Sequence, residues 1–407
     1  MQLNQYSYNS ISGWSKKLDN SLDSKNTLIL IFASHDISTT LNPINELIDA
    51  FTNSKFMGCS TAGEIIGNSI SDDRFVVQII KFEKSKLQLA SVKIANSHKS
   101  QGIGKQLIDK IDKEGLKYIF ILGTSLHING SQFIEGISDI DLQDVVITGG
   151  FAGDDQLFEK TWVLVDKKPS YDSVSALAIY GEELYVGYGA KDGCNQLGIR
   201  REVTHSFENI LYALDNQSAL ELYKYYLGKR ADGLPGTGLI FPLGVYIDGK
   251  IKIRTIIGVN EKEDYLVFTG DIPQGATVTL LKSNLDSLVQ SAKDAIGFIH
   301  FDNKVSSPLL CISVSCIGRK VILGQRIEDE IETIMDTLPE NTQQIGFYSY
   351  GEISLNNLGK CDLYNHTMSL TPTTGKIRHS KPPTIPPTGG TRRSIHWFRP
   401  IRTSPMT

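Results

Sequence analysis

The feature that most constrains the fold is a unit of strand, helix and strand that occurs three times along the chain. The first strands are the apolar runs "TLILIFAS", "YIFILGTS" and "PLLCISVSCIG", each followed by a helical pattern. The units end in "KFMGCSTAGEI", "VVITGGFAGDD" and "QIGFYSYGEI". This recurrence indicates one supersecondary unit that the chain uses more than once.

Each unit closes with a glycine and an acidic residue, at Gly63–Glu64, Gly153–Asp154 and Gly351–Glu352. Glycine permits positive φ angles and close backbone approach, and a carboxylate in such a turn can accept bonds from backbone N–H groups. Two interpretations follow. Either each acid closes its own turn, or the strand ends converge and present the acids to a cationic group of a ligand.

The remaining segments predict an α+β fold with mixed β-sheets, helices and two related halves. Residues 75–82 and 87–94 are strand-like runs close enough to form a hairpin. The amphipathic stretch 104–115 predicts a helix that ends at Gly115. After Lys160, runs such as "SVSALAIYG" predict antiparallel strands, and "SALELYKYYLG", "LDSLVQSAKDAIGFI" and "RIEDEIETIMDTL" predict helices.

The composition is that of an ordinary globular protein, with 407 residues, 40% hydrophobic and 21% charged. The length allows two domains with sizeable cores. No run of about 18 apolar residues occurs, and the polar N-terminus lacks the apolar segment of a signal peptide. The five cysteines are odd in number and widely spaced, which favours reduced thiols. We therefore expect a cytoplasmic protein without a membrane partner.

Charge is unevenly distributed along the chain. Residues 375–407 hold seven of the 41 basic residues and none of the 45 acidic ones, which leaves a formal charge of −11 on residues 1–374. An acidic body argues against nucleic-acid binding. The proline-rich segment 372–407 has no hydrophobic period, and we expect a disordered basic tail. A linker or non-native sequence is the favoured interpretation, and contact with nucleic acid or acidic lipid is the alternative.

Several of these stretches together resemble the signature of the FIST sensory domain. They are, in order, "MGCSTAGEI", "GGFAGDD", "GLIFPLGV", "RTIIGV", "SCIGR" and "GFYSYGEI", and "LYNHTMSLT" resembles the usual end of the family. The resemblance covers residues 27–371. It divides the chain into an N-terminal extension (1–26), a FIST N-like half (27–220), a FIST C-like half (221–371) and the tail (372–407).

The resemblance implies a cytoplasmic, non-enzymatic input module for signal transduction that binds small ligands such as amino acids. Members of the family occur alone or joined to histidine kinases, chemotaxis receptors or cyclic-dinucleotide enzymes, and some are haem-based nitric oxide sensors. This sequence shows no kinase ATP motif, no GGDEF-like string and no coiled coil of several heptads. We therefore expect it to act through a separate partner and to need no cofactor, with haem as the alternative.

A hydrolase-type enzyme that uses Cys59 is a rival interpretation. A thiolate nucleophile needs a lowered pKa and a nearby base, and no histidine lies near Cys59 in the sequence. The histidines form no HxxxH, HxH or CxxCH pattern, although His127 or His205 could hold haem iron alone. The stretch "SQGIGKQL" lacks the spacing of a phosphate-binding loop.

Small-ligand binding has residue types that suit an amino acid. Arg254 and Arg319 can pair with a carboxylate, although Arg254 can equally form an internal salt bridge. Tyr348 and Tyr350 alternate on one face of a strand and can line a pocket. We predict a pocket where the glycine turns meet; a ligand-free scaffold is the alternative. The predicted ligand-binding set, without catalytic or metal-binding members, is Cys59, Ser60, Thr61, Glu64, Asp154, Asp155, Arg254, Arg319, Tyr348, Tyr350 and Glu352.

Overall fold

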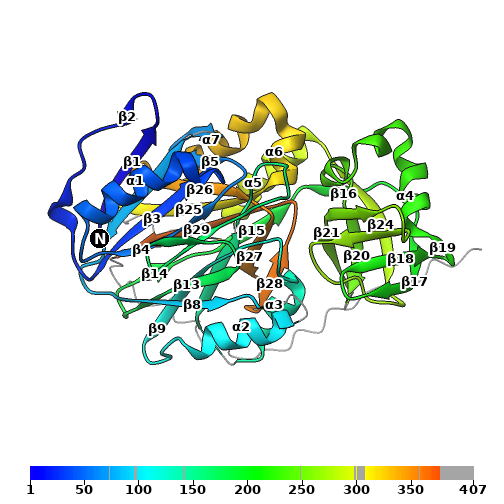
Figure 1. Ribbon diagram of the computed structural model, residues 1–407, viewed down its shortest axis with the longest axis horizontal. Helices are drawn as coiled ribbons and strands as arrows, with labels where there is room; N and C mark the ends of the chain where they lie inside the picture. Colours follow the sequence, from blue (N-terminus) through cyan, green and yellow to red (C-terminus); the bar gives the residue numbers. More distant parts are fainter. Residues whose placement is uncertain are drawn as a thin grey trace, which may run out of the picture. The chain divides into compact units, whose positions relative to one another are not determined.

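The computed structural model describes residues 1–375 apart from positions 73, 96–98, 141, 143, 248, 298, 300–307 and 357. The strands among these residues form four β-sheets, each with its helices, which confirms the predicted α+β fold with mixed sheets. Three sheets carry the repeated units. The strands of the fourth, together with α4, are gathered apart from the others in Figure 1. None of the described helices is long and apolar enough to cross a bilayer.

The three repeated units are parallel strand pairs, each joined by a helical connection. The first is β3 (Thr27–Ala33), α1 (Ile37–Ala50) and β4 (Lys55–Ser60). The second is β9 (Leu116–Gly123), α3 (Gly130–Ser138) and β10 (Val146–Phe151). The third is β25 (Leu309–Cys316), α6 (Ile317–Leu323), α7 (Ile327–Thr337) and β26 (Thr342–Ser349). The prediction of a reused supersecondary unit is therefore confirmed.

After each glycine–acid turn, the chain leaves its own sheet and joins a neighbouring one. The hairpin β5 (Glu64–Ile66) and β6 (Ser69–Ser71) pairs with β26 of the third unit. The hairpin β27 (Gly351–Leu355) and β28 (Cys361–Tyr364) pairs with β10 of the second unit. The hairpin β11 (Val163–Val165) and β12 (Lys168–Ser170) pairs with β4 of the first unit. The three sheets are thus linked in a closed cycle.

A second crossing explains why the predicted hairpin over residues 75–94 is wrong. Strand β7 (Phe75–Lys81) lies between β3 and β1 (Gln2–Asn9) in the first sheet, so both of its edges are occupied. Strand β8 (Lys86–Lys93) therefore pairs in the second sheet with β13 (Ser173–Tyr180). In the third sheet, β14 (Tyr185–Val186) and β15 (Gly189–Asp192) pair with β29 (Thr367–Thr374).

Both ends of the described chain belong to this arrangement. The predicted N-terminal extension contains β1, which is part of the first sheet, and β2 (Gly13–Trp14). Strand β29 continues to Thr374, past the predicted start of the tail at residue 372. A Cβ added at Gly375 would lie 3.0 Å from the Cβ of Met1, so the two ends of the described chain lie next to each other. Residues 376–407, on which most of the tail prediction falls, lie outside the described residues.

The three sheets share one core because side chains alternate between the two faces of each strand. Leu30, Phe120 and Ile312, on the central strands β3, β9 and β25, pack into one common hydrophobic cluster. Their sequence neighbours Ile29 and Ile119 face outwards into separate clusters with the covering helices. Each sheet is therefore buried on both faces, which is why its central strands are continuous apolar runs.

The outer faces are covered by the helices of the repeats and by two additional ones. Helix α2 (Ser100–Asp109) packs against α3, and α5 (Leu285–Gly297) packs against α7. The prediction that the first of these ends at Gly115 is wrong, because the helix stops at Asp109 and Lys110 is its C-cap. Gly115, with φ of +68°, instead forms the turn that leads into β9.

The fourth sheet, which we call the inserted sheet, comprises residues 194–283. Its own cluster of buried side chains includes Val203, Leu220 and Phe268. Helix α4 (Ala219–Leu227) spans the expected boundary at residue 220, so both predicted halves contribute to this sheet. Its strands are β16 (Cys194–Gln196), β17 (Arg201–Phe207), β18 (Ile210–Leu214), β19 (Gln217–Ser218), β20 (Leu243–Ile247), β21 (Lys250–Arg254), β22 (Ile256–Asn260), β23 (Tyr265–Phe268) and β24 (Thr277–Ser283).

The close packing of α2 on α3 gives a stability prediction. A Cβ added at Gly136 would lie 1.8 Å from the carbonyl oxygen of Gln101, whereas one added at Gly102 meets nothing within 4 Å. We expect Gly136→Ala to lower the free energy of unfolding by about 2 kcal/mol or more, because backbone must move. Gly102→Ala, the matched control in α2, should raise it by about 0.5–1 kcal/mol. Urea unfolding of both variants is the measurement, and equal effects would contradict the packing.

Candidate functional site

The three glycine–acid turns meet and hydrogen-bond to one another through their backbones. The N–H of Ala62 donates to the carbonyl oxygen of Tyr348 at 2.9 Å. The N–H of Tyr348 in turn donates to the carbonyl oxygen of Gly63 at 2.9 Å. The N–H of Gly153 donates to the carbonyl oxygen of Ser60 at 3.1 Å, and the N–H of Tyr350 donates to the carbonyl oxygen of Phe151 at 3.1 Å. We call this cycle, residues 60–64, 151–155 and 348–352, the turn ring.

Gly153 shows why a residue without a side chain is needed in the turn ring. A Cβ at this position would lie 2.9 Å from the backbone nitrogen of Ala62. The turns of the first and second units therefore approach too closely for any other residue. The predicted convergence of the strand ends is what the structure contains.

Glu64 and Glu352 occupy matching places in the ring. The hydroxyl of Thr61 donates to Glu64 Oε1 at 2.6 Å, and that of Ser349 donates to Glu352 Oε1 at 2.6 Å. Burial raises the pKa of each carboxyl to about 8, although these hydrogen bonds by themselves lower it. Both acids are therefore bonded within their own turns and carry protons over much of the physiological pH range.

Asp154 closes its turn differently, through backbone N–H groups. Its carboxylate accepts bonds from the N–H groups of Phe158, Glu159 and Lys160 at 3.1, 2.7 and 2.6 Å. The Tyr350 hydroxyl also donates to Asp154, and it lies 2.7 Å from the carbonyl oxygen of Asp155. Asp154 therefore links the second and third turns by hydrogen bonds to other groups of the protein.

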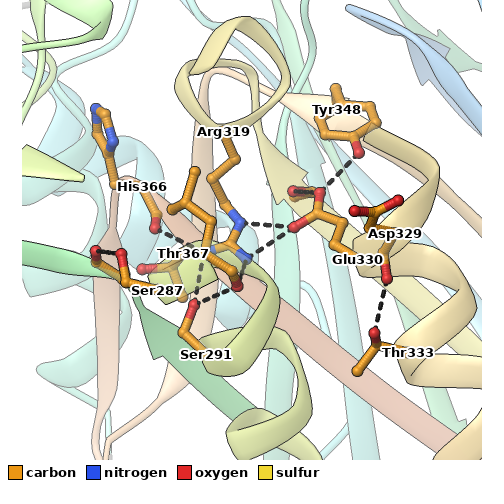
Figure 2. A network of polar contacts seen from close by, with 12 residues as sticks. Ser287, Ser291, Arg319, Asp329, Glu330, Thr333, Tyr348, His366 and Thr367 are labelled. Carbon is orange, nitrogen blue, oxygen red and sulfur yellow. Dashed lines mark hydrogen bonds and ion pairs between the residues drawn. The ribbon is translucent and has the colours of Figure 1, made fainter. Parts of the chain in front are cut away.

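Arg319 forms a buried ion pair that ties the helices of the third unit together (Figure 2). Its Nη2 lies 2.7 Å from Glu330 Oε2, and both side chains are fully buried. The same guanidinium donates to Ser291 Oγ at 3.0 Å and to the carbonyl oxygen of Leu288 at 2.7 Å. The Tyr348 hydroxyl donates to Glu330 Oε1 at 2.7 Å. Arg319 and Tyr348 are thus engaged with Glu330, which the sequence analysis did not single out.

The sequence does carry a signal for Glu330. In α7, Ile327, Ile331 and Ile334 follow the spacing of a core-facing stripe, and Glu330 lies on that stripe. An acid on the buried face of a helix needs a buried partner, because an unpaired charge is costly to bury. Arg319 is the partner that the fold supplies.

Lys320 connects the turn ring from its solvent side and was also missed. Its Nζ lies 2.7 Å from the carbonyl oxygen of Ala62 and 3.3 Å from Asp155 Oδ1, and it also contacts Asp72. Lys320 is the first residue after Arg319 on α6, so successive side chains serve the core and the ring. This cation links all three units at one place.

The environment of Cys59 disfavours a thiolate nucleophile. The side chain is fully buried, and burial together with the nearby Glu64 raises the pKa of the thiol well above its usual range. The neighbouring Ser60 hydroxyl accepts a hydrogen bond from the N–H of Trp162 at 3.0 Å. Of the haem-ligand candidates, His205 stacks on the ring of Tyr212 with centroids 4.6 Å apart, and His127 is exposed.

Arg254 lies away from the turn ring, where the inserted sheet meets the second unit. Its Nη2 donates to Ser131 Oγ at 3.2 Å and its Nη1 to the carbonyl oxygen of Ile253 at 3.1 Å. Among the described residues no carboxylate lies within ion-pair distance of this buried guanidinium, although Asp271 and Asp362 are near enough to interact with its charge. The predicted salt bridge of Arg254 with a turn acid is therefore not formed.

We call the contact between the inserted sheet and the repeated units the seam. Leu239 packs across it into the hydrophobic cluster that includes Ala62 and Ile317, and several polar bonds cross it as well. The Asn129 Nδ2 donates to Asp271 Oδ1 at 2.6 Å. The Thr269 hydroxyl donates to Asn365 Oδ1 at 2.6 Å, and Lys252 Nζ lies 2.9 Å from Asp362 Oδ1.

A cavity of about 210 Å³ opens in the seam, and both polar and apolar side chains line it. Its walls come from β15, from β21, and from the strand ends around β27 and β28. The lining residues are Ala190, Lys191, Asp192, Lys250, Ile251, Lys252, Ile253, Asn356, Asp362, Leu363, Tyr364, Asn365 and Thr367. Of the predicted site residues none is in this lining, but Arg254 directly follows Ile253 on β21.

The seam cavity is connected to the turn ring through Thr367. This residue lines the cavity, and its N–H donates to Glu352 Oε2 at 3.2 Å. The preceding His366 has φ of +56°, and its carbonyl oxygen accepts from Arg319 Nη1 at 3.3 Å (Figure 2). A displacement of the cavity wall at Thr367 would therefore change the hydrogen bonds of Glu352 in the third turn and of Arg319 in the buried ion pair.

The sequence model of the FIST N domain matches residues 27–217, and that of the FIST C domain matches residues 219–354. An uncharacterized protein of Methanocaldococcus jannaschii is 24% identical over 311 residues, which cover 69% of this chain and 57% of that protein. The chain thus spans little more than half the length of this curated relative.

One solved structure is also similar in part. It is a cyanuric acid hydrolase from A. caulinodans, with a TM-score of 0.36 and 6% sequence identity, covering 92% of this chain and 98% of that one. A score and an identity at this level carry no argument about activity.

The buried ion pair gives a second stability prediction. Glu330→Gln removes the charge that Arg319 needs, and we expect it to lower the free energy of unfolding by about 3–5 kcal/mol. Glu332→Gln, on the exposed face of α7, is the matched control and should change it by less than about 0.5 kcal/mol. Urea unfolding measures both, and similar small effects would show that the pair does not stabilise the fold.

The raised pKa values predict how stability depends on pH. Glu64 and Glu352 have an ordinary pKa of 4.5 and a folded pKa of about 8, so the folded state binds more protons between these values. Their stabilising contribution is present below pH 4.5 and is lost as the pH rises through 8. The loss amounts to roughly 5 kcal/mol for each carboxyl.

The test is urea unfolding between pH 5 and 9 for the wild type and two variants. We expect Glu64→Gln and Glu352→Gln each to flatten the fall in stability between about pH 5 and 8, because glutamine does not ionise. Parallel pH profiles for all three proteins would contradict the assignment.

Proposed function

Because the chain belongs to the FIST family, whose FIST N and FIST C domains are characteristic of sensory proteins, we propose that it senses a small ligand in the seam cavity. The observation that carries this proposal is the cavity itself. Its volume of about 210 Å³ lies below the usual range for drug-sized ligands, which favours a small metabolite. Amino acids are the first class to test.

The position of the cavity supports a sensing role. Its walls come from the inserted sheet on one side and from the repeated units on the other, so a ligand that touches both favours one arrangement of the two. The contacts across the seam include individual polar bonds, such as that of Lys252 with Asp362. A ligand therefore competes with contacts of modest strength.

The bond from Thr367 to Glu352 supplies a path for the response. A ligand that moves the cavity wall at Thr367 changes the environment of a buried carboxyl in the turn ring. The ring joins all three sheets, so its change alters the surface offered to a partner. We propose a separate signalling protein in the cytoplasm as that partner, of the histidine kinase, chemotaxis or cyclic-dinucleotide class.

The test is a thermal shift panel of the twenty amino acids with the purified protein. A ligand at a hundred times its Kd adds about 2.7 kcal/mol of stability, so the active compound should raise Tm by a few degrees. Ala190→Phe, which fills the cavity from β15, should abolish the shift. Lys262→Phe, on an exposed turn of the inserted sheet, is the control and should retain it.

A shift that is unchanged in Ala190→Phe would place the ligand elsewhere and contradict the proposed site. No shift with any member of the panel would remove the support for amino-acid sensing. Parallel incubation with haem reports whether the shift belongs to that ligand class instead.

A further inference from the structure

We propose that the ligand of the seam cavity is a small dicarboxylate held between Lys191 and Lys250, an inference that rests on the sensing function proposed above. Both lysines line the cavity and both are exposed, so their ammonium groups are accessible to an entering ligand. Lys191 belongs to β15 of the repeated units, and Lys250 begins β21 of the inserted sheet. The two cations therefore come from opposite sides of the seam.

The charges of the cavity lining are not balanced. Lys252 is paired with Asp362 at 2.9 Å, and Asp362 also accepts from the N–H of Leu363 at 2.9 Å. Asp192 accepts from the N–H of Cys194 at 3.1 Å. Within the described part of the chain, Lys191 and Lys250 form no ion pair. The lining thus holds three lysines against two aspartates, a formal charge of +1, and neither Lys191 nor Lys250 has an ion-pair partner in it.

Arg254, which is buried next to the cavity wall, adds a further positive charge close to the cavity. Its guanidinium is buried beside the cavity-lining Ile253 and bonds to neutral oxygens, among them Ser131 Oγ at 3.2 Å. The nearest acids, Asp271 and Asp362, are engaged with Asn129 and Lys252. Asn129 is neutral, so Asp271 keeps its charge and offsets part of the positive potential of Arg254; the remainder favours an anion.

Two carboxylates fit the arrangement better than one. A monoanion pairs with a single lysine and leaves the other as it was. A dicarboxylate can pair with both, and in doing so it bridges the inserted sheet and the repeated units. The ion pair between Lys252 and Asp362 shows that the two sides already approach within hydrogen-bonding distance. Bridging therefore supplies the differential binding that a sensor needs to shift its conformational equilibrium.

The experiment is isothermal titration calorimetry of the full chain with succinate, glutamate, glutamine and inorganic phosphate at low salt. We expect succinate and glutamate to bind. Glutamine has nearly the shape of glutamate without its second negative charge, and it should bind about tenfold more weakly. Inorganic phosphate distinguishes a carboxylate site from a general anion site and should bind more weakly than succinate.

Variants assign the binding to the two lysines. Lys191→Gln and Lys250→Gln should each weaken succinate binding by about tenfold, because one charge-assisted bond is lost. Lys250→Arg keeps the charge and should restore most of the affinity. Lys262→Gln, an exposed lysine outside the cavity, is the matched control and should leave the affinity unchanged.

Equal affinity for glutamate and glutamine, or full succinate affinity in the two glutamine variants, would overturn the dicarboxylate assignment. Tighter binding of phosphate than of succinate would overturn it as well. If none of these probes binds while another amino acid gives a shift that Ala190→Phe abolishes, this inference fails and the proposed sensing function stands. If no amino acid gives a shift either, both fail.

Discussion

The exchange of hairpins among the three repeated units is the constraint on which the rest of the structure depends. Each unit contains its own parallel strand pair, and the hairpin after its turn adds a strand to another unit's sheet. Because the exchange is cyclic, each unit depends on another for the strand that covers its sheet edge, and removing one hairpin would expose that edge. The shared core of Leu30, Phe120 and Ile312 follows from the same closure, since all three inner faces must be apolar at once. The inserted sheet has its own core and stands outside this cycle.

That constraint explains the chemistry of the acidic turns. Backbone bonds that close the ring bring Glu64, Asp154 and Glu352 into one region, as expected for a shared site, yet each acid is bonded by protein groups. The nearby arginine, Arg319, is likewise committed to Glu330. The side chains of the turn ring therefore hold the fold together. The open cavity, with more lysines than aspartates in its lining, lies at the seam. Thr367, which lines the seam cavity and bonds to Glu352, joins the two.

Local patterns predicted the elements well and their partners poorly. Apolar runs and helical spacing correctly placed β3, α4 and α7, and the glycine–acid echo identified the three units. Whether β8 pairs with β7 or with β13 depends on which sheet edges are free, and no local pattern contains that information. Glu330 could have been found from its place on the buried stripe of α7. Lys191 and Lys250 could not, because exposed lysines on short strands are common and only the meeting of β15 with β21 gives them a role.

The central claim is that a ligand acts by joining the two sides of the seam, and hydrogen exchange of the backbone amides tests it most directly. With succinate bound, the account predicts slower exchange in Lys250–Arg254, Cys361–Tyr364 and Gly189–Asp192, the strands that wall the cavity. Exchange in Gln2–Asn9, in the sheet that contributes no wall, should be unchanged. Slower exchange confined to the turn ring, or unchanged exchange at all three cavity walls, would contradict the account.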